Sequence, residues 1–172
     1  MIRFVSPVLR LIDRVSPPDR VSAHCDIPCG IYDPHMAQIA ALTVVRMDQL
    51  VAALQMPAMD DRTAMDTYAN SYTRYIRTKE EHAELCKKEI DILWHDYFRP
   101  EHLEKYPDLH TTVWNAEKLA SRNKQNVDLD AANQLLAATH RIAEIFWDTK
   151  GVATRKGPSN QTVGGELVYV AG

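Results

Sequence analysis

The chain of 172 residues is 45% hydrophobic and 25% charged, and its formal net charge is −3. This length predicts one domain that is large enough to bury a hydrophobic core. The near-neutral charge excludes the basic face of a general nucleic-acid binder. The sequence contains no uninterrupted apolar run of about eighteen residues, so no membrane span is predicted. Three cysteines are too few for a disulfide scaffold, which favours a reducing compartment or a metal site.

The first 23 residues predict a leader that is removed. Arg10, Asp13 and Arg14 interrupt any apolar stretch, so a secretory signal fits poorly. We interpret residues 1–23 as the short propeptide of a cytoplasmic protein, and an organelle transit peptide stays open as the alternative.

A run of metal donors and turn formers follows the leader: His24-Cys25-Asp26-Ile27-Pro28-Cys29-Gly30. If the chain is cut directly before this run, His24 gains an α-amine beside its imidazole. That amine and the backbone nitrogen of Cys25 can close one chelate ring on a metal, and the Cys25 thiolate closes a second. Pro28 bends the chain so that the Cys29 thiolate can complete a square plane. Planar nitrogen and sulfur donors favour Ni(II) or Cu(II) over tetrahedral zinc.

The roles of the residues around these donors can also be predicted, and for Tyr32 and Asp26 two interpretations are open. The imidazole of His24 can approach the metal along the axis. Tyr32 is either a loop anchor or a hydrogen-bond donor above the open face of the metal, and Asp26 is either a turn former or an acceptor behind it. Without the cut, the Cys25 and Cys29 pair is equally typical of a weak zinc half-site or a redox pair. Cys86 is expected to be a small buried hydrophobic residue.

Four amphipathic helices are expected after this run. Asp33-Pro34 is typical of a helix start, and the predicted helices cover about residues 35–56, 60–98, 107–124 and 128–150. Short connections between four such helices predict an all-α fold, an antiparallel four-helix bundle with an N-terminal metal-binding hook. Residues 24–150 would form this domain. Residues 151–172 are rich in turn formers and predict a flexible C-terminal tail, in which 167–170 could pair as an edge strand or dock on a partner.

Residues His24–Pro34 strongly resemble the nickel hook of the nickel-containing superoxide dismutases. A second stretch, Ile90–Pro100, is similar to that family's Leu-Trp-x-Asp-Tyr-Phe-Lys-Pro segment. Residues 104–110 and 145–150 fit the family as well, so that the similarity covers about residues 24–150. We call residues 24–34 the hook segment below.

The resemblance implies an enzyme that disproportionates superoxide to oxygen and hydrogen peroxide through a Ni(II)/Ni(III) cycle. It implies a four-helix subunit in a homohexamer and a maturation protease that removes the leader. The nickel ligands would be the His24 amine and imidazole, the Cys25 amide and thiolate, and the Cys29 thiolate. Tyr32, with Asp26 behind it, would guard the open face.

The chain departs from the family at one supporting pair. Some members orient the axial imidazole with a Glu–Arg pair, and the matching positions here are Ala40 and His82. We hypothesise that His82 replaces that pair as a hydrogen-bond partner of the His24 ring, the alternative being a solvated helix residue. Pro28 would shape the hook through a cis peptide with Ile27.

Three other functions compete with this interpretation. A nickel or copper carrier could use the same donors without turnover, and a redox sensor could toggle Cys25 and Cys29 without any metal. A ferritin-like di-iron protein is disfavoured, because no histidine in the chain has a glutamate three positions before it.

Overall fold

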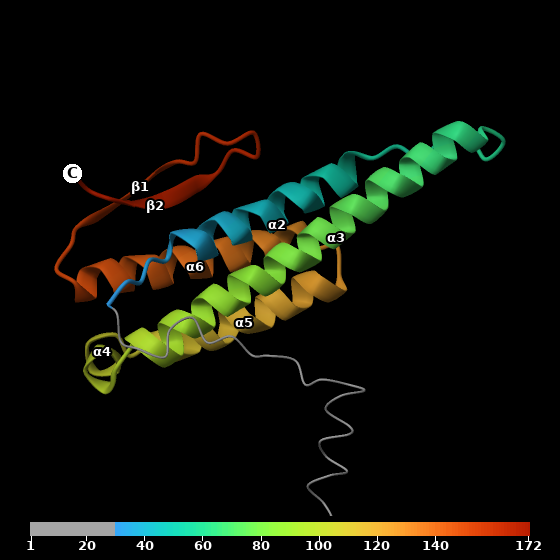
Figure 1. Cartoon of the computed structure of the whole chain (residues 1–172). Coiled ribbons are helices and arrows are strands. Elements are labelled where there is room, and N and C mark those ends of the chain that lie inside the picture. The colour runs from blue at the N-terminus through green and yellow to red at the C-terminus, as the bar shows by residue number, and fades with distance from the viewer. Residues whose placement is uncertain (1–29) are drawn as a thin grey trace, which may run out of the picture.

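The structure, a computed structural model, describes residues 30–172. That part of the chain is mostly helical, and its four longest helices lie side by side (Figure 1): α2 (His35–Ala53), α3 (Arg62–Ile92), α5 (Leu109–Gln125) and α6 (Leu129–Thr149). α2 packs against α3 and α6, and α5 packs against the same two helices, so each long helix has two helical neighbours. Between α3 and α5 the chain makes a π-helical turn, η2 (Leu93–Tyr97), and the short helix α4 (Pro100–Lys105).

Aspartates set three of the helix starts, as the sequence predicted. Their side chains accept hydrogen bonds from backbone N–H groups of the first turn: Asp33 from His35 at 2.7 Å, Asp61 from Ala64 at 2.9 Å and Asp128 from Ala131 at 2.9 Å. Two helix ends differ from the prediction. α2 ends at Ala53, before the expected residue 56, and α3 ends at Ile92, because the backbone then widens into a π turn in which Phe98 N–H donates to Leu93 O at 2.9 Å.

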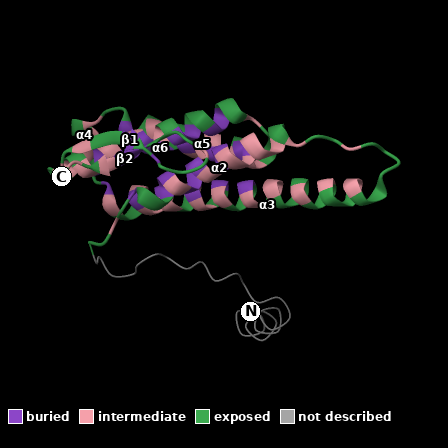
Figure 2. Cartoon of the chain, turned by 90° about the horizontal axis from the view of Figure 1, so that it is seen from above, coloured by how far each residue is buried: buried purple, intermediate pink, exposed green. Residues whose placement is uncertain are grey.

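The core lies between the four long helices and contains many small residues. Ala40, Ala83 and Ala132 have no exposed surface, which lets neighbouring helices approach closely, and Phe146 of α6 is also fully buried. α3 is longer than this core. Its buried residues begin at Lys79, and its first half projects beyond the other helices (Figure 2).

One ion pair lies inside the core. Lys79 Nζ of α3 lies 3.4 Å from Asp48 Oδ1 of α2, and their side chains are only 2% and 0% exposed. Lys79 also donates to the backbone oxygen of Asn126, and the Asp128 N–H donates to Asp48 Oδ2 at 3.3 Å. The pair therefore connects α2 and α3 to the loop between α5 and α6.

Residues 154–170 form a β-hairpin where composition predicted a flexible tail. β1 (Thr154–Pro158) pairs antiparallel with β2 (Glu166–Val170). The glycines that suggested flexibility occupy the turn, where Gly164 and Gly165 have φ angles of 76° and 73° that other residues rarely adopt. The backbone freedom of these two glycines therefore allows one defined turn between β1 and β2, and it does not make the segment a flexible tail.

The hairpin is attached to α2 and α6 by specific contacts. Val168 N–H donates to Gln38 Oε1 at 2.7 Å, and Gln38 Nε2 donates to Val168 O at 3.3 Å. Leu167 and Val168 are buried, and Lys156 pairs with Glu144 of α6 at 3.1 Å. The possibility that 167–170 pairs as a strand is thus the one that the structure bears out.

Within residues 30–172, α2 is the single helix that is long and apolar enough to cross a membrane by length and composition. The sequence had not suggested such a segment. In the fold α2 packs between α3 and α6 and buries residues such as Ala41 and Val44, which is the location of a core helix.

Candidate metal centre

The sequence-predicted site residues fall on both sides of the boundary of the described chain. His24, Cys25, Asp26, Pro28 and Cys29 lie outside the described residues. The two remaining candidates, Tyr32 and His82, lie inside them. The structure therefore describes the end of the hook segment, from Gly30 onwards, and the helices that surround it.

The end of the hook segment lies against a cavity of about 180 Å³ between the start of α2 and the end of α3. Its lining comes from both sides: Ile31, Tyr32, Asp33 and Met36 from the N-terminal side, and Glu89, Ile92 and Leu93 from α3 and η2. The lining therefore combines apolar side chains with the two carboxylates of Asp33 and Glu89. Residues 31–33, which follow the predicted donors in the sequence, thus line a cavity at the N-terminal end of α2.

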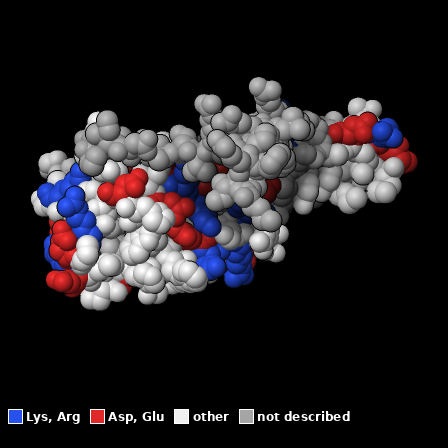
Figure 3. All heavy atoms as spheres, turned by 60° about the horizontal axis from the view of Figure 1, so that its bottom comes forward, with Lys and Arg blue, Asp and Glu red and all other residues white. Residues whose placement is uncertain are grey.

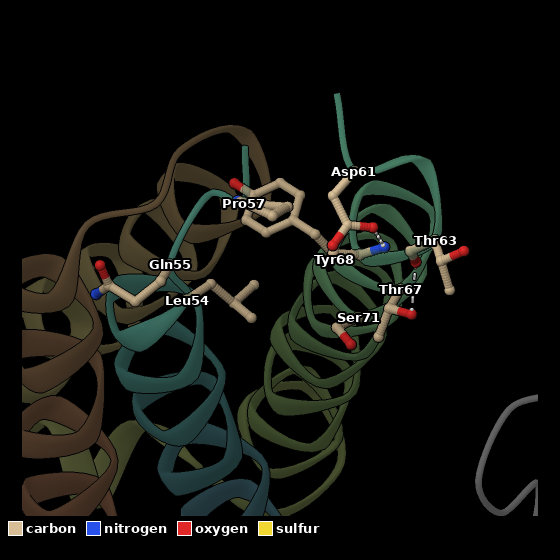
Figure 4. A pocket seen from close by; sticks show the side chains of 9 residues that line it. Leu54, Gln55, Pro57, Asp61, Thr63, Thr67, Tyr68 and Ser71 are labelled. Atoms are coloured by element: carbon tan, nitrogen blue, oxygen red, sulfur yellow. Dashed lines mark hydrogen bonds between the residues drawn. The ribbon is translucent and has the colours of Figure 1, made fainter. Parts of the chain in front are cut away.

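A second cavity, of about 450 Å³, lies at the opposite end of α2 (Figure 4). It is lined by the end of α2, the following loop and the first turns of α3, including Leu54, Pro57 and Tyr68. α2 has 19 residues, which places this cavity about 28 Å along the helix from the hook segment. It is therefore not part of the candidate metal centre.

Tyr32 is anchored in an aromatic cluster centred on Tyr97. The Tyr32 and Tyr97 ring centroids are 5.6 Å apart, and Tyr97 also contacts Phe146 at 4.6 Å. His102 stacks on Tyr97 at 5.6 Å with an interplanar angle of 19°, and Lys150 Nζ lies 5.4 Å from the Tyr97 ring centroid. This ring contact agrees with the loop-anchor interpretation of Tyr32, and the proposed role of its hydroxyl group stays a prediction.

His82 lies on α3, half-buried, and its Nδ1 lies 2.8 Å from Thr78 O. Since a carbonyl oxygen only accepts, Nδ1 carries the proton, and in the neutral ring Nε2 is then an acceptor. His82 precedes Glu89 by seven residues, two helical turns, so both lie on the same face of α3. Ala40 is fully buried. The position that holds a carboxylate in some family members is thus an apolar contact in this chain.

The third cysteine is not available as a metal ligand. Cys86 is fully buried on α3, and burial raises the pKa of its thiol to about 12. The prediction that it is a small buried hydrophobic residue is confirmed. From Gly30 onwards there is no group of three or more His, Cys, Asp or Glu side chains that could hold a metal ion. The candidate donors therefore precede α2.

Sequence reasoning missed two contacts that join distant parts of the chain. Tyr97 stood in the segment that carried the resemblance, but the aromatic pattern did not show that it contacts Tyr32 from a distant part of the chain. Glu117 of α5 interacts with Asp91 of α3, and burial together with this neighbouring carboxyl raises the pKa of Glu117 to about 7. Neither pairing has a local sequence signal, because each joins two different segments of the fold.

The fold and the hook segment together define a helical protein whose candidate metal donors all precede the helical domain. A model of the family described as nickel-containing superoxide dismutase matches residues 19–150, and the chain belongs to this family. It is accordingly a nickel-dependent superoxide dismutase, an oxidoreductase.

Curated relatives agree with this assignment. The superoxide dismutase [Ni] of Streptomyces seoulensis is 41% identical over 135 residues, which cover 78% of this chain and 94% of the relative. The enzyme of the same name from Streptomyces coelicolor (strain ATCC BAA-471 / A3(2) / M145) is 38% identical over the same shares.

Solved structures show the same fold. One is a nickel-containing superoxide dismutase with nickel ligation corresponding to the oxidised state; it has a TM-score of 0.63 and 40% identity and is covered over 99% of its length by 74% of this chain. The native 1.30 Å structure of a nickel superoxide dismutase matches with the same TM-score and coverage at 38% identity. The family match ends at residue 150, so the C-terminal hairpin lies beyond it.

Proposed function

We propose that the mature enzyme begins at His24, after removal of residues 1–23, and that the hook segment holds the nickel ion. The ligands would be the α-amine and imidazole of His24, the backbone nitrogen and thiolate of Cys25, and the thiolate of Cys29. Thiolate and amide donors bind nickel better than they bind hard cations such as magnesium or calcium. The observation that carries the proposal is that residues 30–172 offer no alternative metal site. Cys86 is fully buried in the core, and this part of the chain contains no group of three or more His, Cys, Asp or Glu side chains that could hold a metal ion.

When bound, nickel supplies the one-electron chemistry that converts superoxide to oxygen and hydrogen peroxide. The residues of the chain then bind and orient the anion. The phenol of Tyr32 can donate a hydrogen bond to superoxide, and its ring is held in place by Tyr97 at 5.6 Å. Asp26 would accept from groups behind Tyr32, and Pro28 would bend the hook segment back towards the metal.

His82 would take the place of the Glu–Arg pair. Its Nδ1–H is bound to Thr78 O at 2.8 Å, so Nε2 can accept a hydrogen bond from the His24 ring or from water beside it. A partner of this kind fixes the orientation of a ligating imidazole. The location of His82 on the same face of α3 as the cavity lining supports this role.

For the whole protein we propose the four-helix subunit of the family, with the hook at its N-terminus, assembled as a homohexamer in the cytoplasm after a maturation protease has removed the leader. Acidic and basic side chains are interspersed on the part of Figure 3 that grey atoms do not cover, which differs from the basic face of a nucleic-acid binder. We propose that the enzyme acts without a nucleic-acid or membrane partner. With a net charge of −3 the approach of an anion needs local positive charge, and Lys150, beside Tyr97, can supply it.

The direct test is maturation of the full chain in the presence of nickel. Intact mass should give a new N-terminus at His24, with one nickel ion per chain and rapid superoxide decay in stopped-flow measurements. Cys25→Ser and Cys29→Ser should abolish nickel binding, whereas the matched control Cys86→Ala should retain it. His24→Ala should slow turnover more than it weakens nickel retention, because the planar sulfur donors remain.

Two outcomes would contradict the proposal. Fully active protein that still carries residues 1–23 would show that the His24 amine is not a ligand. Stoichiometric nickel without turnover in the matured chain would favour the carrier instead.

A further inference from the structure

A cavity of about 480 Å³ lies between α2 and the turn that joins β1 to β2. One face of α2 lines it at the helical spacing i, i+3, i+4 and i+7, and the turn lines the other side: Ile39, Leu42, Thr43 and Arg46 from α2, and residues 161–163 from the turn. The volume is in the range of small-molecule sites. The family match ends at residue 150, so the turn side of this cavity lies beyond it. The cavity shares no lining residue with the one beside the hook segment.

The hairpin turn orients the polar wall of this cavity through Gln49. Gln49 Nε2 donates to Val163 O at 3.4 Å, and Gln49 Oε1 accepts from Arg46 Nη1 at 3.3 Å. The turn also comes close to the apolar wall, because a Cβ added to Gly165 would lie 3.4 Å from Leu42 Cδ1. The turn is thus fixed against α2 on both sides of the cavity, and the guanidinium is held at its edge.

The charge of Arg46 has no counter-charge in this cavity. The seven lining residues include no Asp or Glu, and none of the ion pairs among residues 30–172 includes Arg46. A guanidinium has five N–H donors, and Gln49 accepts from one of them. The cavity therefore offers one positive charge with unused donors beside the apolar side chains of Leu42 and Val163.

We propose that this cavity binds a small carboxylate with an apolar body, the chemistry of a medium-chain fatty acid. The carboxylate pairs with the Arg46 guanidinium, whose planar fork matches its two oxygens, and the apolar body packs on Ile39, Leu42 and Val163. A monoanion fits better than a phosphate dianion, because the lining supplies one positive charge. This site is additional to superoxide disproportionation and does not depend on how nickel is bound.

The probe is octanoate, and its matched controls are 1-octanol, which lacks the charge, and acetate, which lacks the apolar body. In calorimetric titration of the purified protein, octanoate should saturate below about 10 mM, the weakest dissociation constant expected for a ligand of its size. Both controls should bind at least about tenfold more weakly. Bound octanoate should slow hydrogen exchange in residues 161–163. Absence of saturation, or saturation without slower exchange in these residues, would overturn the proposal.

Two variants test the two walls of the cavity separately. Arg46→Met removes the charge from α2 and keeps an unbranched side chain, and it should raise the dissociation constant of octanoate at least about tenfold. Val163→Trp fills the cavity from the turn, leaves α2 unaltered and should weaken binding as much. The control Arg155→Met removes an arginine of β1 that lies over the Tyr169 ring, outside the lining, and should bind octanoate like wild type. Wild-type affinity in either Arg46→Met or Val163→Trp would refute the site.

Discussion

The buried ion pair between Asp48 and Lys79 predicts an asymmetric response to mutation. Both side chains are at most 2% exposed, and the charged atoms are 3.4 Å apart. Asp48→Ala leaves a buried ammonium whose remaining partner is the Asn126 carbonyl, which should cost about 3–5 kcal/mol of unfolding free energy. For a chain of this size that corresponds to a fall in Tm of about 6–20 °C.

Lys79→Met should cost less, because the carboxyl that it leaves behind can take up a proton. Burial, the largest influence, already raises the pKa of Asp48 above its ordinary value. A raised folded-state pKa means that the folded chain holds this proton more tightly than the unfolded chain, so stability is lost as the pH rises through the folded-state pKa. The penalty of Lys79→Met should therefore shrink as the pH falls, whereas the penalty of Asp48→Ala should not.

The assay is urea unfolding followed by circular dichroism, at one fixed protein concentration because assembly would add to stability. The double variant Asp48→Leu with Lys79→Met should lie much closer to wild type than Asp48→Ala, because no charge is left in the core. Equal costs for both single variants at every pH, or a cost below about 1 kcal/mol for Asp48→Ala, would refute this reasoning.

The remaining predictions concern the hairpin and His82. Gln38→Ala leaves the N–H and carbonyl of buried Val168 unpaired and should cost about 1–3 kcal/mol, measured as faster hydrogen exchange in residues 154–170, with little change in α5. Burial lowers the pKa of His140, which lies under the hairpin near Lys156, Glu144 and Glu166. The folded chain therefore binds this proton less tightly than the unfolded chain, and stability is lost as the pH falls below about 6.5. Hydrogen exchange of β1 and β2 should speed up between about pH 7.5 and 5.5, and in His140→Leu this dependence should disappear. His82→Ala should lower turnover about tenfold or more and change the nickel spectra, and unchanged turnover with unchanged spectra would remove its proposed role.

The helix starts could be predicted from the sequence because their signals are local. Asp33, Asp61 and Asp128 each act within three residues of their own position. The thiol of Cys86 was assigned to the core because it stands alone within a helix. These features need no information about the rest of the fold.

The features that sequence reasoning missed depend on partners far along the chain. The hairpin was taken for a flexible tail because its attachment depends on Gln38, which is 130 residues from Val168. The hydroxyl groups of Tyr97 and Thr149 are hydrogen-bonded although the two residues are 52 positions apart, and neither has a pattern that announces the other. The candidate metal donors could be identified from the sequence alone because all of them fall within six consecutive residues.

The hydrogen bonds between Gln38 and Val168 also set an order of events during protein synthesis. α2 leaves the ribosome well before its partner strand β2, because Val168 follows Gln38 by 130 residues. Until then the Gln38 side of α2 has no cover, and closing so long a chain segment is entropically slow. The first helix of the described chain, which follows the hook segment directly, therefore reaches its final environment only after the hairpin has been made, so stable insertion of nickel should follow synthesis of residues 154–170.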